Sequence, residues 1–440
     1  MAELKGSFAL GIMFKDFPDR VFAVRRESPL IVGVAEGECF IASDVPAILQ
    51  YTRDYYLLAH DEIVTLSPDG VSFVDEHLDP IEKELQTADW DMEAAEKGGY
   101  PHFMIKEINE QPEAIRTTIM PRIKEGLPFL EECGITTETI KNFKNITIVA
   151  CGTAMHAGLM GKSIIEKLCR IPVEVDIASE FRYRNPIIDE KTLCIFVSQS
   201  GETADTLAAL RLSKSHGART LAISNVIGST ITREADYTIY THAGPEIAVA
   251  STKAYTSQVC LIAMLGIYFA ELLGSYSKDE LEKLKADILD LPSKIEAVLD
   301  NSKEIKTFAS KVYTQKDMFF LGRGTDYNVA LEGSLKLKEI SYIHSEAYAA
   351  GELKHGPIAL ITTNTPVVAT VTQEKLMSKE LSNIKEVKSR GADIVLFIKE
   401  ALSGDLDTEY QVIKLPDMQD EFMVLPASVA LQLLAYYVSS

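Results

Sequence analysis

The residues with the clearest chemical meaning stand together in one short turn, Ser198-Gln199-Ser200-Gly201-Glu202-Thr203. Its three hydroxyl side chains can donate hydrogen bonds to an anion, and its glycine lets the backbone come close to a ligand. If the turn opens a helix, free backbone N–H groups and the positive end of the helix dipole also favour a phosphate. An ordinary helix cap is the simpler alternative, since Ser and Thr are common there. The density of hydroxyls, with Gln and Gly, favours phosphate binding.

A second group of charged residues, Glu332, Lys336 and Glu339, has the spacing i, i+4, i+7. On the helix that we predict for Val329 to Ile340, all three lie on one face. Such a series is usually a solvated ion-pair face. The apolar residues that flank them (331, 335, 337 and 340) instead predict a helix largely enclosed by protein. A carboxylate in such surroundings tends toward a raised pKa and can act as a base near neutral pH.

Two further segments carry candidate residues. His355 lies in a loop bounded by Gly and Pro, where it is a candidate acid or base, although a single His is more often structural. Val249 and Ser251 precede a long helix predicted for Ala254 to Leu273. They could offer donors to a ligand, and an N-cap role explains Ser251 about as well.

The elements that must position these residues differ along the chain. The uncharged run 192–197 predicts a buried strand before the phosphate turn, and Ala204 to His216 predicts an amphipathic helix after it. Beyond Tyr100, helices alternate with short buried strands, which predicts βαβ units and a parallel sheet. Residues 7 to about 76 predict an antiparallel meander instead, followed by an acidic linker. The candidate strands are Ser7–Phe14, Val21–Val24, Leu30–Val34, Cys39–Ala42 and Ile63–Leu66.

The region after Tyr100 contains an internal repeat, with landmarks in the same order about 170 residues apart. The matched pairs are 146–153 with 318–325, Ser179-Glu180 with Ser345-Glu346, the strand ending at Ser198 with 367–371, and 217–219 with 391–393. We therefore expect two copies of one α/β domain. In the second copy the phosphate turn has become 372–375 (TQEK), with a carboxylate where hydroxyls stood. The first copy should bind the anion and the second should supply other chemistry.

Composition limits the class of protein. The chain has 440 residues, 46% hydrophobic and 25% charged, as expected for two or three globular domains. Its net charge of -20 argues against nucleic-acid binding. The six scattered cysteines, with no CxxC pair, indicate reduced core residues of a cytosolic protein. The longest uncharged run, Ala254 to Ala270, falls short of the ~20 apolar residues of a membrane span, so we expect no membrane partner.

At these motifs the chain resembles the glutamine-dependent fructose-6-phosphate aminotransferase family, also called glucosamine-6-phosphate synthase. The resemblance covers essentially the whole chain. Its motifs are ACGT, ASEFRYR, SQSGETADT and EIAVASTKAYTSQ in the first copy and GRGTDYNVALEGSLKLKEISYIHSEAYAAGELKHGP in the second. The bridge GGYPHFMIKEINEQP is similar to the family's interdomain segment, and residues 6 to about 76 resemble the C-terminal half of its glutaminase domain. Ala154 and Ala248 stand where the family usually has Ser and Gly.

The resemblance implies an α/β fold with two sugar-isomerase (SIS) domains, each a parallel sheet flanked by helices, after part of an antiparallel Ntn-type glutaminase domain. The implied boundaries are 1–81 for the glutaminase half, 82–104 for the linker, 105–290 for the first SIS domain and 291–440 for the second. The implied activity is transfer of ammonia from glutamine to fructose 6-phosphate and isomerisation of the product to glucosamine 6-phosphate, the precursor of amino sugars. A cytoplasmic enzyme is implied, with no metal and no organic cofactor.

The resemblance also implies residue roles. Ser198, Gln199, Ser200 and Thr203 hold the phosphate, and Thr153, Val249 and Ser251 lie near the sugar. Glu339 is the base that moves a proton between C1 and C2, a task suited to an enclosed carboxylate. Lys336 contacts the sugar and balances that charge, and Glu332 orients the lysine. His355 assists ring opening and reaches the site from a second subunit, so a homodimer is expected.

The ends of the sequence depart from the family, whose glutaminase uses an N-terminal Cys and whose C-terminal tail carries a Schiff-base Lys. This sequence begins Met1-Ala2-Glu3 and ends in an uncapped apolar helix, so we expect a fragment without glutaminase activity of its own. Two alternatives stay open. A non-catalytic sugar-phosphate sensor would need a basic helix-turn-helix segment, whereas the N-terminal part is β-like. A glutamine-independent isomerase or deglycase would not need a glutaminase-like half.

Overall fold

The N-terminal part of the computed structural model is built from two antiparallel sheets. The structure describes residues 4–88, 96–124, 127–128 and 130–440, except Glu27, Pro46, Asp405 and residues 407–409. One sheet has the order β1-β2-β6-β7-β8, and its strands are Phe8–Phe14, Phe17–Arg26, Ile63–Ser67, Gly70–Val74 and Pro80–Ile81. The other has the order β4-β3-β5-β9, with strands Glu38–Ala42, Ile31–Ala35, Asp54–Leu57 and Gln86–Thr87.

All five predicted strands of this part are present, but the single meander was wrong. After β2 the chain leaves its sheet, forms the β3–β4 hairpin, and pairs β3 with β5 rather than with β2. It returns to the first sheet at β6, which pairs with β2. Buried apolar residues from both sheets, including Ala23, Val32 and Phe73, pack in one cluster between them. The predicted linker contains β9, and its residues 89–95 lie outside the described residues.

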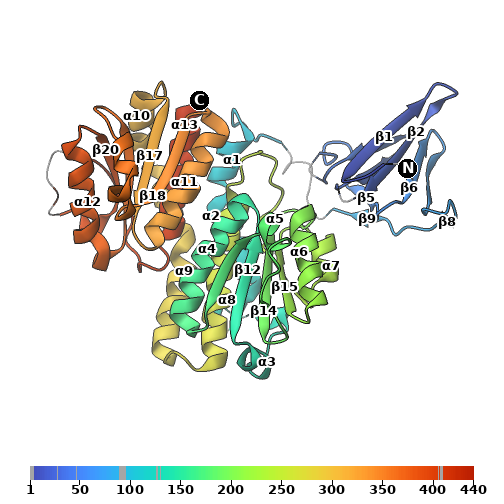
Figure 1. The fold of residues 1–440 in the computed structure, drawn as a ribbon. Helices are drawn as coiled ribbons and strands as arrows, with labels where there is room; N and C mark the ends of the chain where they lie inside the picture. Colours follow the sequence, from blue (N-terminus) through green and yellow to red (C-terminus); the bar gives the residue numbers. More distant parts are fainter. Residues whose placement is uncertain are drawn as a thin grey trace.

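The first α/β domain has a parallel sheet of order β13-β12-β14-β15-β16 (Figure 1). Its strands are β12 Asn145–Ala150, β13 Val173–Ile177, β14 Thr192–Ser198, β15 Arg219–Ser224 and β16 Tyr237–Tyr240. Its helices are α3 Thr137–Asn142, α4 Gly152–Cys169, α5 Ala178–Phe181, α6 Ala204–Ser215, α7 Thr230–Glu234 and α8 Lys253–Leu273. The central strand β14 is buried along its whole length, as its uncharged sequence predicts.

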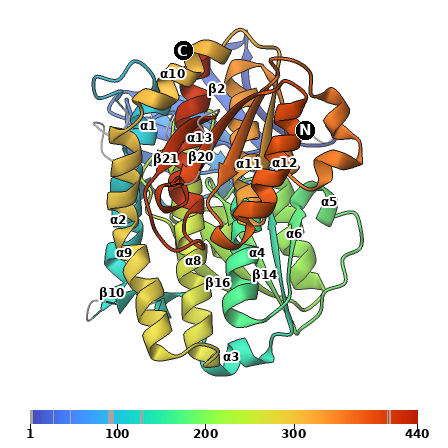
Figure 2. The ribbon, with the colours of Figure 1, turned by 90° about the vertical axis from the view of Figure 1, so that its left-hand side faces the viewer.

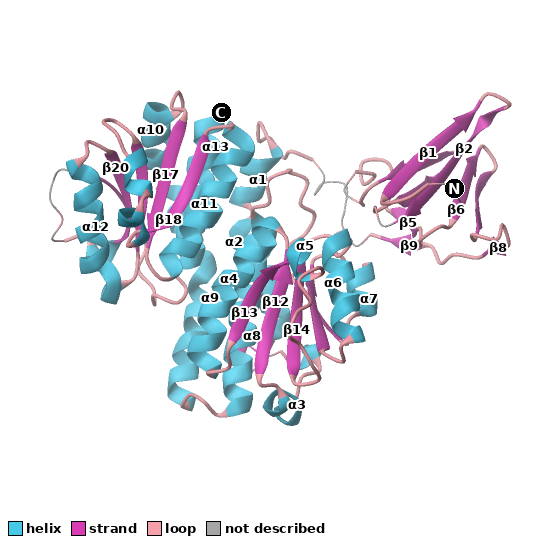
Figure 3. Ribbon diagram, viewed as in Figure 1, coloured by secondary structure: helices cyan, strands magenta, loops and turns pink. Residues whose placement is uncertain are grey.

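The second α/β domain repeats this topology with the order β18-β17-β19-β20-β21. Its strands are β17 Asp317–Gly322, β18 His344–Ala349, β19 Pro366–Val371, β20 Asp393–Lys399 and β21 Gln411–Leu415. Its helices are α10 Lys303–Val312, α11 Thr325–Ser341, α12 Met377–Ser389 and α13 Val424–Ser439. The predicted duplication is thus confirmed, and the cyan and magenta elements of Figure 3 show helices on both faces of each parallel sheet.

One matched pair of the repeat was wrong. Ser179 lies in α5, after β13 has ended, whereas Ser345 lies inside β18. Because β13 and β18 hold the same place in the two sheets, the serines stand on opposite sides of a strand end. The two Ser-Glu pairs therefore do not occupy equivalent positions in the two domains, although their sequences match.

Helices from both α/β domains share one large apolar core (Figure 2). Helix α4 packs against α8, α11 packs against α13, and α11 meets α4 across the domain boundary. The helices α1 Phe103–Asn109, α2 Gln111–Ile119 and α9 Lys278–Asp300 connect and cover these elements. Among the described residues, only α8 is long and apolar enough to cross a membrane, and 83% of its apolar window is buried inside the protein. It is placed as a core helix.

Candidate active site

The phosphate turn has the predicted strand–turn–helix setting, with Ser198 ending β14 and Thr203 preceding α6. The hydroxyl of Ser198 accepts a hydrogen bond from the Gly201 N–H at 3.0 Å and lies 3.2 Å from the Thr203 hydroxyl. The Ser200 hydroxyl accepts from the Glu202 N–H at 3.2 Å. The turn therefore closes around its own hydroxyl groups, which gather at the start of a 12-residue helix.

Tight packing holds the back of this turn. Gly201 has a φ of +67°, and a Cβ there would lie 2.1 Å from the Ser229 hydroxyl oxygen. The Glu202 carboxylate caps α7, where it accepts from the Thr230 N–H at 2.6 Å and from the Thr230 hydroxyl at 3.0 Å. The only acidic side chain of the turn is thus used by a neighbouring helix, which lowers repulsion toward an anion.

The equivalent turn of the second domain is already occupied by a carboxylate of the chain. Asp326, in the first turn of α11, accepts from the Thr372 N–H at 2.7 Å and from the Thr372 hydroxyl at 2.5 Å. Asp326 is fully buried, and burial raises the pKa of its carboxyl well above the usual range. Its counterpart in the first domain, two residues after the matching glycine, is Ala154. The turn at Ser198 has no such built-in anion.

Glu332 of α11 joins the two domains. Its side chain is 1% exposed, and it accepts a hydrogen bond from the Thr153 hydroxyl at 3.1 Å. His156 Nδ1 lies 2.6 Å from the second carboxylate oxygen. Thr153 and His156 are both on α4, which begins directly after the strand β12 of the first α/β domain. The α4–α11 crossing thus brings predicted residues of both copies together.

His156 is a site residue that the sequence reasoning missed. It lies three residues after Thr153 and therefore shares its helix face. That spacing, within a helix that opens with a glycine turn, was the signal that could have found it. A lone His in an apolar helix is otherwise indistinguishable from a core residue.

Lys336 and Glu339 complete the cluster. The Lys336 side chain is 1% exposed, and its ammonium lies 2.6 Å from a Glu339 oxygen and 3.5 Å from a Glu332 oxygen. Among the described residues the ammonium makes no aligned hydrogen bond to either carboxylate, and it is buried beside both of them. Glu339 is 35% exposed, so its prediction as an enclosed carboxylate was wrong and fits Glu332 instead. The cause is its position in the last turn of α11, where the helix leaves the core.

The loop before α8 is fixed by an acid of its own. The Ser251 hydroxyl donates to Glu246 at 2.8 Å, and the same carboxylate accepts from the N–H groups of Thr252 at 2.8 Å and Ala254 at 3.0 Å. Glu246, and not Ser251, therefore caps this helix start. Val249 stands fully exposed at the loop tip.

His355 lies in an exposed 3-10 turn after β18. Within the described residues, no hydrogen bond or ion pair joins it to the Glu332 cluster.

A cavity of about 210 Å³ adjoins the phosphate turn. Gln199, Ser200 and Glu246 line it from the first α/β domain, and Arg25 and Tyr55 line it from the N-terminal sheets. The N-terminal part thus stands directly against the face that carries the phosphate turn.

Comparison with known proteins identifies the family to which the chain belongs. The SIS domain model matches residues 139–268 and 311–437. The glutamine–fructose-6-phosphate aminotransferase (isomerizing) of Clostridium acetobutylicum is 56% identical over all of this chain and 72% of its own length, and that of Clostridium tetani is 55% identical over the same shares. The chain belongs to the glutamine–fructose-6-phosphate aminotransferase family. The resemblance found at the motifs is thereby confirmed.

A solved structure of this aminotransferase family supports the same assignment. The C-terminal domain of glucosamine-fructose-6-phosphate aminotransferase from Francisella tularensis is 40% identical to this chain, with a TM-score of 0.76. The match covers 78% of this chain and 97% of that domain. Both α/β domains of this chain are therefore SIS domains, as the duplicated motifs predicted.

Proposed function

We propose that this chain binds fructose 6-phosphate at the junction of its two SIS domains and carries out the isomerisation that yields glucosamine 6-phosphate, with ammonia derived from glutamine in the intact enzyme. The observation that carries the proposal is the hydrogen bond from Thr153 to Glu332. It joins the domain that holds the phosphate turn to the helix that holds the acid–base residues. Relatives matched over the whole chain bear the aminotransferase name, which favours this function over a sensor or a glutamine-independent isomerase.

The hydrogen-bond donors for the phosphate lie in the first SIS domain, in the turn between β14 and α6. Ser198, Gln199, Ser200 and Thr203 would bind it together with the N-terminus of α6. The acidic side chain of this turn, Glu202, is hydrogen-bonded to Thr230. Thr153, Val249 and Ser251 would face the sugar.

The proton transfer falls to α11. After amination, the Glu339 carboxylate takes a proton from C1 and delivers it to C2, while the C1 hydroxyl loses its proton and the imine nitrogen gains one. These transfers convert the ketose imine into the 2-amino aldose. Its partial exposure suits a group that must reach the substrate. The Lys336 ammonium stabilises the negative charge that develops on the sugar oxygen. Glu332, held by Thr153 and His156, fixes the position of that lysine.

The remaining assignments extend this function to the whole assembly. We place the glutaminase (Ntn-type) part at residues 1–81, the linker at 82–104, and the SIS domains at 105–290 and 291–440. His355 would assist ring opening from a second subunit of a homodimer in the cytoplasm. Its exposure on the surface of one chain is compatible with that role.

Solvent exchange tests the assignment of the base. The chain is incubated with glucosamine 6-phosphate in deuterium oxide, and NMR follows deuterium entry at C2. We expect Glu339→Gln to abolish exchange while calorimetry still detects sugar-phosphate binding. Lys338→Gln, an exposed neighbour on the same helix, is the matched control and should exchange like the wild type. Full exchange by Glu339→Gln would show that the base is another residue.

A further inference from the structure

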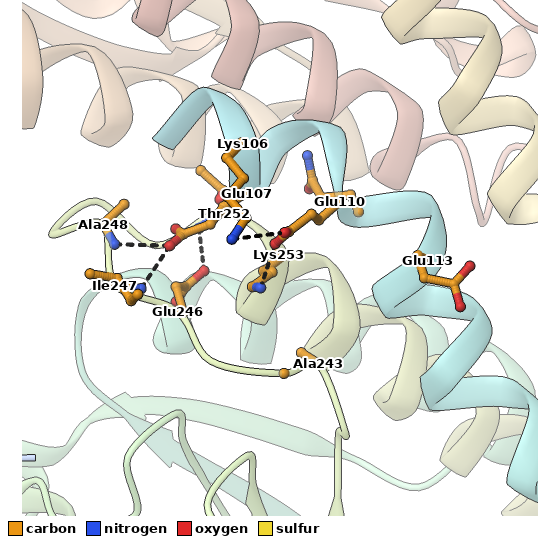
Figure 4. A network of polar contacts seen from close by, with 12 residues as sticks. Lys106, Glu107, Glu110, Glu113, Ala243, Glu246, Ile247, Ala248, Thr252 and Lys253 are labelled. Atoms are coloured by element: carbon orange, nitrogen blue, oxygen red, sulfur yellow. Dashed lines mark hydrogen bonds and ion pairs between the residues drawn. The ribbon is translucent and has the colours of Figure 1, made fainter. Parts of the chain in front are cut away.

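A buried acid outside both SIS sheets holds the loop 246–252, which precedes α8 (Figure 4). Glu107 lies on α1, which precedes the first strand of the first SIS sheet in the chain, and is 2% exposed. One of its oxygens accepts from the Ile247 N–H at 2.7 Å and from the Ala248 N–H at 3.0 Å. The two peptide groups directly before Val249 are thereby fixed from outside their own loop.

The rest of the loop is fixed from within. Glu246 accepts from the Ser251 hydroxyl and from the N–H groups of Thr252 and Ala254. Glu107 and Glu246 together satisfy donors on both sides of Val249, whose side chain is left in the open. The loop 246–252 therefore presents Val249 in a defined conformation although its tip packs against nothing.

This loop is tied to the phosphate turn. The N–H of Asn225 donates to the Gln199 carbonyl at 3.1 Å, and its side-chain amide donates to the Gly244 carbonyl at 2.7 Å. Glu246 and Gln199 also line the same cavity. A displacement of the loop would thus change the space beside the phosphate turn.

The charges around Glu107 make its burial costly. Its second oxygen has no hydrogen-bond partner among the described residues, and its neighbour Glu246 is also acidic. Burial, together with Glu246, raises the pKa of Glu107 to about 7, although Lys253 and the two backbone donors oppose the rise. Lys253 itself is ion-paired with Glu110 at 2.7 Å, and Lys106 lies 3.5 Å from Glu110. An apolar side chain would fill this place at lower cost, but it could not hold two N–H groups.

We propose that Glu107 is a positioning residue that fixes the loop 246–252 so that Val249 and Ser251 meet a sugar whose phosphate is held at Ser198–Thr203. The inference rests on the proposed function, because it assumes a sugar phosphate at that turn. Glu107 touches no substrate and acts through the Ile247 and Ala248 peptides.

Three substitutions separate positioning from general structure. Glu107→Ala removes the acceptor, Glu107→Asp keeps the charge but withdraws it by one methylene, and Glu107→Gln keeps an acceptor oxygen of the same reach. Glu113→Ala is the matched control, because that acid lies exposed on the adjoining helix α2 and pairs with Arg116 at 3.3 Å. Hydrogen exchange measured by mass spectrometry reports on peptides covering 244–252. Calorimetry gives Kd for glucosamine 6-phosphate and for inorganic phosphate, which lacks the sugar.

We expect Glu107→Ala and Glu107→Asp to speed exchange of the Ile247 and Ala248 amides and to weaken glucosamine 6-phosphate binding about tenfold or more. Inorganic phosphate binding should stay within about twofold of the wild type, since the turn is intact. Glu107→Gln and Glu113→Ala should behave as the wild type does. Should Glu107→Ala not fold, the milder Glu107→Asp gives the same readouts.

Two results would overturn the proposal. One is unchanged protection of both amides in Glu107→Ala and Glu107→Asp. The other is an equal loss of affinity for glucosamine 6-phosphate and for inorganic phosphate, which would indicate general damage. If the wild type bound no glucosamine 6-phosphate, the proposed function would fail and the sugar role of Glu107 with it. The amide exchange would then still show whether Glu107 holds the loop.

Discussion

Replacing Gly201 by alanine should disable the phosphate turn. A φ of +67° costs an L-residue with a side chain about 1–2 kcal/mol. The new Cβ would also lie 2.1 Å from the Ser229 hydroxyl oxygen and 2.6 Å from the Ser229 Cβ. Ser229 is buried and its hydroxyl is 3.3 Å from that of Thr232, so it has little room to move. Such overlap costs a further ~1–3 kcal/mol. The sum is roughly 2–5 kcal/mol.

The overlap is best relieved by moving the turn itself. That movement takes the Gly201 N–H away from the Ser198 hydroxyl and disperses the donors that gather there. We therefore expect Gly201→Ala to lower the affinity for inorganic phosphate by at least about tenfold, measured by calorimetry. Urea denaturation should show the loss of stability at the same time.

Gly217→Ala is the matched control for backbone strain. Gly217 also has a positive φ, +82°, but no atom lies within 4 Å of the position of its Cβ. It should lose about 1–2 kcal/mol of stability from strain and keep its phosphate affinity. If Gly201→Ala bound phosphate as the wild type does, with the stability of Gly217→Ala, the close packing behind the turn would not matter for binding. That result would refute the inference that the geometry at Gly201 determines the phosphate affinity.

Three further outcomes follow from buried groups. The pKa of Glu107 is raised from 4.5 to about 7, so the stability linked to it is full below about pH 4.5 and is lost as pH rises through about 7, by ~3 kcal/mol in all. Burial raises the pKa of Asp326 in the same direction. The melting temperature of the wild type should therefore fall between about pH 4.5 and 7, and that of Glu107→Gln should fall less steeply over the same range. Lys336→Met should lower stability by ~3–5 kcal/mol because it leaves Glu332 charged and buried, and adding Glu332→Gln should restore part of the loss in denaturant melts. Burial raises the pKa of the Cys260 thiol to about 12, so mass spectrometry should find it unlabelled by maleimide at pH 7.5 until the chain is denatured.

The local elements of this site follow from the sequence. An uncharged run before Ser198 and an amphipathic pattern after it fix a strand, a turn and a helix, because each pattern matches one period of structure. The spacing of Glu332 and Lys336 places both on the buried side of α11 for the same reason. The repeat then gives the number and topology of the α/β domains.

Contacts between distant elements could not be read in this way. The bond from Thr153 to Glu332 depends on how α4 crosses α11, and periodicity says which face of a helix is buried but not what it meets. His156 was missed because only that crossing distinguishes it from a core residue. The exposure of Glu339 was misjudged because it depends on where α11 leaves the core, within a turn of its end.

One of the differences between the two copies of the SIS domain, Ala154 against Asp326, affects both halves of the proposed site. In the first copy Ala154 leaves the turn at Ser198 free for an anion from outside. In the second copy Asp326 supplies the anion from within, and its bonds to Thr372 tie the first turn of α11 to the end of β19. The helix anchored in this way carries Glu332, Lys336 and Glu339. Because the Asp326 carboxylate is hydrogen-bonded to the turn at Thr372, it occupies the place of an external anion in that turn. The same hydrogen bonds fix the start of α11. The second copy thus has a fixed helix where the first has an open turn, and a fixed helix suits the acid–base role that we propose for Glu339 and Lys336.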